Sequence, residues 1–331
     1  MSNGAWPLVW DGTGEPPTVS PWGPSGRAAT LTAVAALSKL WLTALNRTTC
    51  AGCDRLYEAV ANRPAGQPLL TVSNHASTLD DPTLFCAMLP LRFFATEPAH
   101  GRVRWTLCAT EICHANKLLS HFFRAGKTLP ISRGAGLEQP VLRLVEEQLR
   151  HGAWVHVFPE GKVRQDGLMN PLKTGFAQLL CGASDASPPP LVVPFHHRGM
   201  SEAMRVKSWP RVNKHVDIVV GAPIDMTDLL LRCRKARRVA CGKIQSYLHS
   251  RKMKTSKNWH AISWTESPHH WRRFGNHIKR SHGFFGRMAP TLGEIESVLF
   301  GALQTPPAFV LPFLCRDHTP LVVQSSCQQL W

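Results

Sequence analysis

Short apolar runs alternate with segments of helical periodicity through the middle of the 331-residue chain, and this alternation limits the fold more than any other feature. We predict strands at residues 68–73, 128–131, 154–158, 191–195 and 215–220, and helices at residues 80–89, 137–150 and 172–181. Most of the strand runs are continuously apolar, which is typical of strands buried on both faces. The sequence therefore predicts an α/β domain with a mainly parallel sheet covered by helices on both faces.

Polar signatures directly follow two of these apolar runs. The stretch Ser73-Asn74-His75-Ala76-Ser77-Thr78-Leu79-Asp80-Asp81 comes after the first run, and Phe158-Pro159-Glu160-Gly161 comes after the third. Ligands of parallel sheets bind at the carboxyl ends of the strands. We therefore expect His75 and Glu160 to meet in one crevice.

The pair His75 and Asp80 has the composition of a general base. A carboxylate beside an imidazole selects one tautomer and stabilises the protonated ring, so the ring can accept a proton. The surrounding sequence holds no protein nucleophile on a sharp elbow. The pair therefore predicts activation of a substrate hydroxyl and acyl transfer to an alcohol. A lone histidine is more often structural, and it is the context of Asn74 and Asp81 that favours catalysis here.

The spacing His-x-x-x-x-Asp resembles the first motif of the glycerolipid acyltransferase superfamily. Within it, several blocks are similar in order and spacing to the tafazzin family: Thr71-Val72-Ser73-Asn74-His75, Glu111-Ile112-Cys113, Ser120-His121-Phe122-Phe123, Ile131-Ser132-Arg133-Gly134 and Trp154-Val155-His156-Val157-Phe158-Pro159-Glu160-Gly161-Lys162-Val163. The resemblance covers residues 28–250. It implies the same α/β fold and a direct attack of a lysophospholipid hydroxyl on an acyl ester, with no metal and no bound cofactor.

The resemblance also assigns roles to single residues. It makes His75 and Asp80 catalytic, and it places Arg133 on the phosphate of the acceptor, where a bidentate guanidinium fits well. The resemblance gives substrate-binding roles to Glu160, Gly161 and Lys162. It gives supporting roles to Asn74, Ser77, Asp81 and Pro194. Simpler roles remain open for some of them: Ser77 and Asp81 as helix caps, and Lys162 as a partner of Glu160. Backbone N–H groups near Gly161, or the charges of Arg133 and Lys162, are the candidate oxyanion donors.

The resemblance implies a transacylase that remodels membrane phospholipids such as cardiolipin, bound peripherally to a mitochondrial membrane, with a lysophospholipid and an acyl donor as partners. An acyl-CoA-dependent lysophospholipid acyltransferase at another intracellular membrane is the first alternative, with acyl-CoA as co-substrate. A non-catalytic, basic protein that binds membranes or nucleic acid is the second. Intact His75, Asp80, Arg133 and Glu160 argue against that second reading, so we expect no nucleic-acid partner.

Charge and composition divide the chain into three parts. The formal net charge is +16, and residues 232–287 hold fifteen basic residues and one acidic residue, a charge of +14. We predict a flexible segment at residues 1–26, an acyltransferase domain at residues 27–250 and a largely disordered basic extension at residues 251–331. Its charge suits an anionic membrane or, equally, nucleic acid, and a solvated tail without a partner is the default interpretation.

Two further expectations concern the membrane and the cysteines. No segment reaches the roughly 20 apolar residues that span a bilayer. Residues 28–45 read as a helix lying in the membrane interface, with Arg27, Lys39 and Arg47 available to phosphates; an ordinary helix packed on the domain is the alternative. The ten cysteines show no zinc-site spacing and no secretory context, so we expect reduced thiols.

Overall fold

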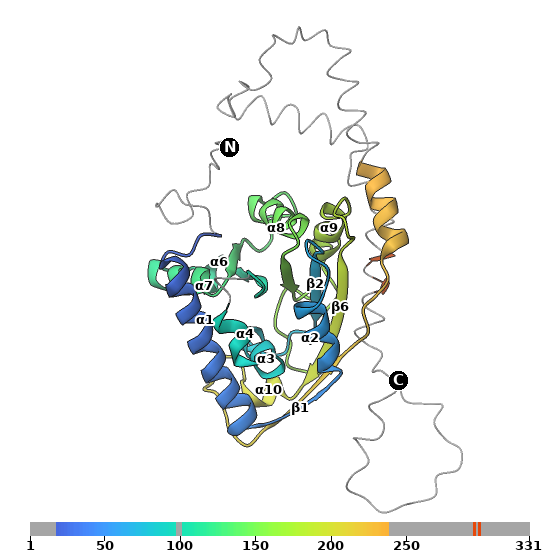
Figure 1. Cartoon of the computed structure of the whole chain (residues 1–331). Coiled ribbons are helices and arrows are strands. Elements are labelled where there is room, and N and C mark those ends of the chain that lie inside the picture. The colour runs from blue at the N-terminus through green and yellow to red at the C-terminus, as the bar shows by residue number, and fades with distance from the viewer. Residues whose placement is uncertain (1–17, 97–100, 238–293, 296, 299–331) are drawn as a thin grey trace, which may run out of the picture.

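A seven-stranded sheet forms the centre of the protein (Figure 1). The computed structural model describes residues 18–96, 101–237, 294, 295, 297 and 298. The strands lie in the order β1-β7-β6-β2-β5-β3-β4. Their bounds are Arg47–Ala51 for β1, Leu69–Ser73 for β2, Trp105–Ala109 for β3, Thr128–Ile131 for β4, Trp154–Val157 for β5, Leu191–Arg198 for β6 and His215–Val220 for β7. Only β6 and β7 pair antiparallel, so the predicted mainly parallel sheet is confirmed.

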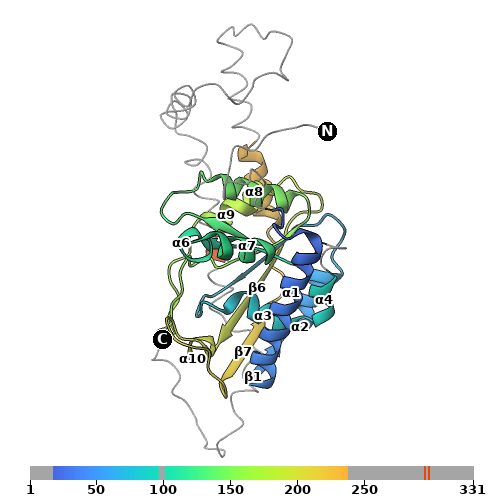
Figure 2. The same cartoon turned by 90° about the vertical axis from the view of Figure 1, so that its left-hand side faces the viewer.

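Helices cover both faces of this sheet. They are α1 (Gly23–Lys39), η1 (Leu40–Ala44, a π-helix), α2 (Cys53–Ala61), α3 (Asp80–Met88), α4 (Leu91–Ala95), α6 (Thr110–Cys113), α7 (Lys117–Ala125), α8 (Pro140–Arg150), α9 (Gly175–Gly182) and α10 (Met200–Ala203). Side chains of a strand alternate between faces. Leu70 therefore joins a core with α8 and α9, whereas Leu69 joins a second core with α1 to α4. Figures 1 and 2 show these two groups of helices apart from each other.

The predicted elements match the observed ones to within a few residues, and α8 shows why. Pro140 begins it, where a missing N–H costs nothing. Gly152, predicted as its terminator, has a φ of +81°. The N–H of Gly152 donates to the Leu149 carbonyl at 2.9 Å and that of Ala153 to Gln148 at 3.0 Å, which is the Schellman pattern. The sequence analysis did not predict β1 and β3.

The helix expected in the membrane interface lies against the domain for most of its length. Leu31 and Ala35 of α1 are buried in the second core. Lys39 donates to the carbonyls at the end of α3, including that of Leu89 at 3.2 Å. Arg27 donates to the Thr18 carbonyl at 2.8 Å. The expectation that Arg27 and Lys39 are available to phosphates was wrong, because both side chains bind backbone carbonyls. The end of the segment, at Leu40, stays exposed.

Disulfides join six of the cysteines in the structure, against the expectation of reduced thiols. The pairs are Cys50–Cys53, Cys108–Cys113 and Cys181–Cys233, with Cα–Cα distances of 5.9, 6.0 and 5.2 Å. These separations lie in the range that a disulfide requires. Sequence spacing did not reveal the third pair because packing alone brings residues 181 and 233 together.

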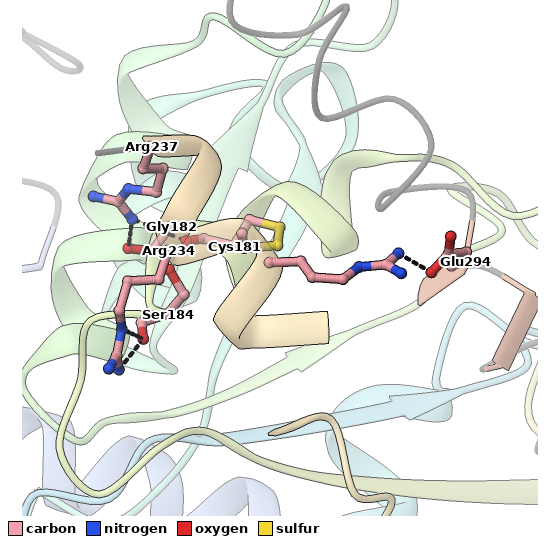
Figure 3. Close-up of a disulfide and its surroundings, with 8 residues drawn as sticks. Cys181, Gly182, Ser184, Arg234, Arg237 and Glu294 are labelled. Carbon is pink, nitrogen blue, oxygen red and sulfur yellow. Dashed lines mark hydrogen bonds and ion pairs between the residues drawn. A yellow bond between two sulfur atoms is a disulfide. The ribbon is translucent and has the colours of Figure 1, made fainter. Parts of the chain in front are cut away.

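A helical segment at residues 227–237 packs beside α9 (Figure 3). Arg237 donates to the Cys181 carbonyl at 2.9 Å, and Arg234 to the Ser184 carbonyl at 3.0 Å. These contacts satisfy carbonyls at the end of α9, where a cation is favourable. Arg232 pairs with Glu294, which lies next to the fully buried Ile295. Residues from the C-terminal part of the sequence thus contribute to the first core.

Three predictions concern residues outside the described ranges. Of the predicted flexible segment at residues 1–26, residues 1–17 lie outside the described ranges. Of the basic block at residues 232–287, residues 238–287 lie outside them. The predicted boundary between residues 250 and 251 also lies outside them. Among the described helices, none is both long and apolar enough to cross a membrane.

Candidate active site

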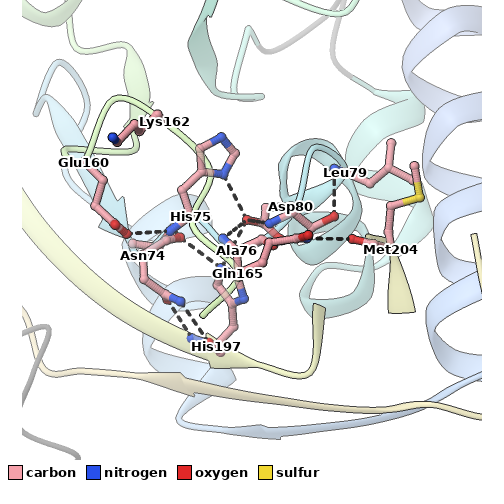
Figure 4. Close-up of polar contacts among 12 residues, drawn as sticks. Asn74, His75, Ala76, Leu79, Asp80, Glu160, Lys162, Gln165, His197 and Met204 are labelled. Atoms are coloured by element: carbon pink, nitrogen blue, oxygen red, sulfur yellow. Dashed lines mark hydrogen bonds and ion pairs between the residues drawn. The ribbon is translucent and has the colours of Figure 1, made fainter. Parts of the chain in front are cut away.

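His75 and Asp80 meet at the carboxyl edge of β2, as predicted (Figure 4). The His75 Nδ1 atom lies 3.0 Å from Asp80 Oδ2. The carboxylate accepts a hydrogen bond from the Nδ1–H group, so the other ring nitrogen, Nε2, keeps a free lone pair. The His75 side chain is 18% exposed while that of Asp80 is fully buried. A substrate can therefore reach the ring, while its carboxylate partner is shielded from water, which is the geometry that a general base requires.

Backbone donors hold the Asp80 carboxylate in place. The N–H groups of Ala76 and Ser77 donate to Oδ2 at 2.7 and 2.8 Å. His197 Nε2 lies 3.5 Å from the same oxygen and 2.9 Å from the Asn74 carbonyl. The loop from residue 74 to residue 80 thus wraps its own acidic side chain and fixes its direction.

Asn74 and Ser77 position this loop rather than a substrate. The Asn74 side chain exchanges two hydrogen bonds with the backbone of His197, both at 3.0 Å. Ser77 is fully buried and its hydroxyl accepts from the Leu79 N–H at 3.2 Å; this is a turn before α3 and not a helix cap, because Leu79 is the N-cap residue and α3 has no side-chain cap. Pro194 lies inside β6, paired in register with Val72. None of these side chains is exposed to a ligand.

Glu160 braces the base from the end of β5. Its Oε1 accepts from the His75 backbone N–H at 2.9 Å. Its Oε2 accepts from the backbone and side chain of Asn170 at 2.7 and 3.0 Å. The side chain is buried, and each of its oxygens has a donor from the chain itself. Glu160 therefore fixes the backbone of the base, and a role in holding glycerol hydroxyls stays a prediction.

The turn after β5 shapes one wall of the site. The Phe158 ring stacks on the His75 ring with centroids 3.9 Å apart. Gly161 has a φ of +68°, a region that favours glycine. Its N–H donates to the Phe158 carbonyl at 3.0 Å. That N–H is therefore not free for an oxyanion, and the exposed Lys162 is another candidate donor on this turn.

Residues that the sequence analysis missed connect this turn to the base. Asn170 bonds Glu160, and Gln165 donates to the carbonyls of Ala76 and Met204 at 2.8 and 3.1 Å. Figure 4 shows Gln165 between the loop that holds Ala76 and the segment that holds Met204. Asparagine and glutamine carry no sequence signal for such a role. Only their position after β5, the strand beside β2, would have pointed to them.

Arg133 lies at the same edge of the sheet but farther along it. It follows β4, which is three strands from β2, so the two strands are about 14 Å apart. The guanidinium makes an ion pair with Glu111 of α6, with Nε 2.9 Å from Oε1. Both side chains are about half exposed, at 47% and 58%. Arg133 is thus accessible to a phosphate, and Glu111 competes for it.

Asp81 does not face the base. Arg104 Nε donates to Asp81 Oδ1 at 2.7 Å, and Arg104 Nη2 donates to the same oxygen. The two side chains are 3% and 5% exposed. The predicted supporting role is therefore a buried ion pair between the start of α3 and the segment before β3. The sequence analysis did not single out Arg104.

A cavity of about 780 Å³ lies at the opposite, amino edge of the sheet. Its lining includes Gly66 before β2, Trp105 at the start of β3, Lys127 before β4 and Gly152 before β5. His75 is not part of this lining. His75 lies at the carboxyl edge instead, with the residues labelled in Figure 4 around it.

Comparison with known proteins bears on the same residues. Residues 55–198 match a family model described as Acyltransferase. The chain is 40% identical over 207 residues to N-acylphosphatidylethanolamine synthase of Arabidopsis thaliana, which covers 60% of this chain and 70% of that protein. The chain belongs to the acyltransferase family.

Two further relatives support that membership. Tafazzin of Drosophila melanogaster is 35% identical over 236 residues, 69% of this chain and 61% of that protein. Taffazin of Dictyostelium discoideum is 36% identical over 194 residues, 57% of this chain and 66% of that protein. The chain thus spans between 61% and 70% of the length of the three relatives. As a member of the family, this protein is an acyltransferase.

Proposed function

We propose that this enzyme transfers an acyl group from an intact phospholipid to the free hydroxyl of a lysophospholipid, and so remodels membrane phospholipids. The observation that carries the proposal is the 3.0 Å contact between His75 Nδ1 and the buried Asp80 carboxylate, beside a partly exposed ring. Membership of the acyltransferase family supports it, as do the relatives named tafazzin. Cardiolipin is the phospholipid that the family resemblance implies.

The chemistry needs one proton shuttle. Nε2 of His75 takes the proton of the acceptor hydroxyl as the oxygen attacks the acyl carbonyl. The tetrahedral intermediate then collapses, the bond to the donor oxygen breaks, and the protonated ring returns its proton to the leaving lysophospholipid. Asp80 stabilises the imidazolium between these steps. The Lys162 and Arg133 cations are the groups proposed to stabilise the oxyanion and to bind the acceptor phosphate.

Acyl-CoA is the alternative donor, because the same base serves either leaving group. A thiolate would then leave in place of an alkoxide, with no change in the roles of His75 and Asp80. We propose no bound cofactor. A mitochondrial membrane is the proposed site of action on the family resemblance, and other intracellular membranes are the alternative.

N-acylation of phosphatidylethanolamine is a second candidate function. The 40% identity to N-acylphosphatidylethanolamine synthase favours it. The acceptor would be the amine of the head group in place of a glycerol hydroxyl. The same histidine would take the proton from the attacking nitrogen.

One assay separates these functions. Purified full-length protein is given radiolabelled lysophosphatidylcholine, lysocardiolipin or phosphatidylethanolamine, with either phosphatidylcholine or acyl-CoA as donor. We expect a labelled, fully acylated phospholipid as the product from a lysolipid and phosphatidylcholine. Product with acyl-CoA alone would identify the alternative donor, and an N-acylated product would identify the second function.

His75→Ala tests the base in the same assay. We expect turnover to fall by at least about 100-fold, because a general base contributes that much, with little change in thermal stability. His151→Ala is the matched control, since His151 is an exposed histidine at the end of α8. Near wild-type activity in His75→Ala would exclude this mechanism.

A further inference from the structure

We infer that the loop at residues 204–214, together with the exposed end of the α1–η1 segment, docks the enzyme on an anionic phospholipid surface. The inference rests on the proposed function, since a lipid acyltransferase must meet its substrates in a membrane. What the inference adds is the part of the protein surface that contacts the membrane. Of the segment at residues 28–45 that the sequence predicted to lie in the membrane interface, this surface takes only the exposed end, because most of the apolar face of α1 is buried in the protein.

Large apolar side chains are exposed together on this part of the molecule. Trp209 is 87% exposed, and its loop neighbours Val206 and Val212 are 46% and 49% exposed. On the adjoining segment, Leu40 and Leu45 are 53% and 46% exposed. Tryptophan and aliphatic residues at such exposure are unfavourable in water, and they fit the boundary between lipid head groups and acyl chains.

The same loop carries only positive charge. Between residues 204 and 214 the basic residues are Arg205, Lys207, Arg211 and Lys214, and no acidic residue occurs. Among the described residues, none of these four side chains has a carboxylate partner. Cations beside exposed apolar groups suit an anionic bilayer, because each cation near the surface contributes roughly 1 kcal/mol of binding free energy through its attraction to the lipid phosphates.

Hydrogen bonds hold the loop against the η1 segment. Trp41 donates from its indole to the Arg211 carbonyl at 2.8 Å. The Asn213 N–H donates to the Leu45 carbonyl at 2.8 Å, and Asn46 Oδ1 accepts from the Lys214 N–H at 2.8 Å. The exposed groups of the two segments therefore form one fixed surface, which needs little ordering when it meets a membrane.

This surface lies at the edge of the sheet that holds His75. The loop follows β6 and α10, and β6 runs parallel to β2, so both strands end at that edge. Gln165 connects them: its amide donates to the carbonyls of Ala76 and Met204, and its oxygen accepts from the Val206 N–H at 3.0 Å. A bilayer that contacts the loop therefore lies on the side from which a lipid can reach the base.

Vesicle sedimentation of the full-length protein tests the surface. Vesicles of phosphatidylcholine alone are compared with vesicles that also contain phosphatidylserine. The charge variant is Arg205→Gln with Lys207→Asn, because Lys207 has a φ of +58° and asparagine tolerates that conformation. The apolar variant is Trp209→Ala. The matched controls are Arg143→Gln, an exposed cation on α8, and Trp22→Ala, a 43% exposed tryptophan at the other end of α1.

The two variants have different expected effects. The charge variant should lose about fivefold in partitioning per removed cation on phosphatidylserine vesicles and nothing on pure phosphatidylcholine, and added salt should abolish the difference. Trp209→Ala should weaken binding to both kinds of vesicle. The controls should bind as the wild type does. If both variants bind like the wild type, or if the controls lose as much as they do, then this surface is not the docking site.

Activity on detergent-solubilised substrates separates this inference from the proposed function. Both variants should keep wild-type turnover in detergent, because neither changes the base or its brace. Loss of activity there would show that the loop acts on catalysis and would overturn the docking role. If the wild type binds vesicles through this loop but transfers no acyl group under any condition, the docking stands and the proposed function fails.

Discussion

Different residues around His75 hold its ring and its backbone in place. Asp80 sets the direction of the ring, while Glu160 fixes the backbone of His75 at 2.9 Å and Phe158 stacks on its face. The two carboxylates have separate tasks because one is bonded to the ring and the other to the peptide N–H. A rigid ring loses little entropy when a substrate binds, which is how positioning contributes to rate.

Glu111 offers a test of the proposed acceptor site. Replacing it by glutamine removes the anion that competes for Arg133, so the KM for a lysophospholipid should fall. An exposed ion pair is worth about 0.2–1 kcal/mol, so the expected change is up to about fivefold. Steady-state kinetics with varied lysophospholipid and constant donor measure it. Arg133→Lys should raise the same KM, and an unchanged KM in both variants would remove Arg133 from acceptor binding.

Buried histidines make the stability depend on pH. Burial, with a smaller contribution from Arg124, lowers the pKa of His114 to about 4. Burial, with smaller contributions from His197 and Arg198, lowers that of His196 to about 4. Burial also lowers the pKa of His156. In an unfolded chain these rings bind protons near pH 6.5.

Below about pH 6.5 the unfolded state therefore binds more protons than the folded state, and acid favours unfolding. We expect the thermal midpoint to fall as the pH is lowered from about 6.5 to about 4, and to be nearly constant from 7 to 8. His196→Gln should reduce this slope, because it removes one of the protons taken up on unfolding. A midpoint that rises towards pH 4 would contradict this account.

At the scale of elements, strand burial explains why β2 was predicted and β1 was not. β2 is buried along its whole length and reads directly as an apolar run. β1 is a polar, mostly exposed strand that pairs only with β7, so its sequence has no strand signature of its own. The end of α8 was predicted correctly because Gly152 has a local conformational reason to be glycine.

The Asp81–Arg104 pair connects α3 to the segment before β3, and it should matter for stability more than for chemistry. Arg104→Met leaves Asp81 buried without a partner, which we expect to cost about 3–5 kcal/mol. The double variant Arg104→Met with Asp81→Leu should recover most of that loss, because the uncompensated charge is gone. Urea denaturation measures both. A double variant as unstable as the single one would show that the pair does more than neutralise charge.

At the scale of the whole molecule, the domain includes residues far beyond the last strand. The disulfide Cys181–Cys233 and the arginines of residues 227–237 attach that segment to α9. Arg232 in turn pairs with Glu294. The fold is therefore completed by residues that follow the basic block.

Substitution of Ile295 tests how much these C-terminal residues contribute to the stability of the fold. It is fully buried in the core formed with α8 and α9, so Ile295→Ala should cost about 2–5 kcal/mol of unfolding free energy. Val298→Ala, at a position 42% exposed, is the control and should change stability by less than about 0.5 kcal/mol. Chemical denaturation of the full chain measures both. Equal small effects would mean that the C-terminal residues are not part of the cooperative unit.

The sequence by itself predicted five of the seven strands, the His75–Asp80 pair and the family, because each of these depends on short-range patterns. Five positions separate His75 from Asp80, and one short loop brings them together. Tertiary structure alone decided that Glu160 bonds the His75 N–H, that Gln165 links two loops, that Arg104 neutralises Asp81 and that Cys181 meets Cys233. These contacts join elements whose neighbours are set by strand order and packing. Spacing along the chain carries no information about that order, so no pattern in the sequence could have revealed them.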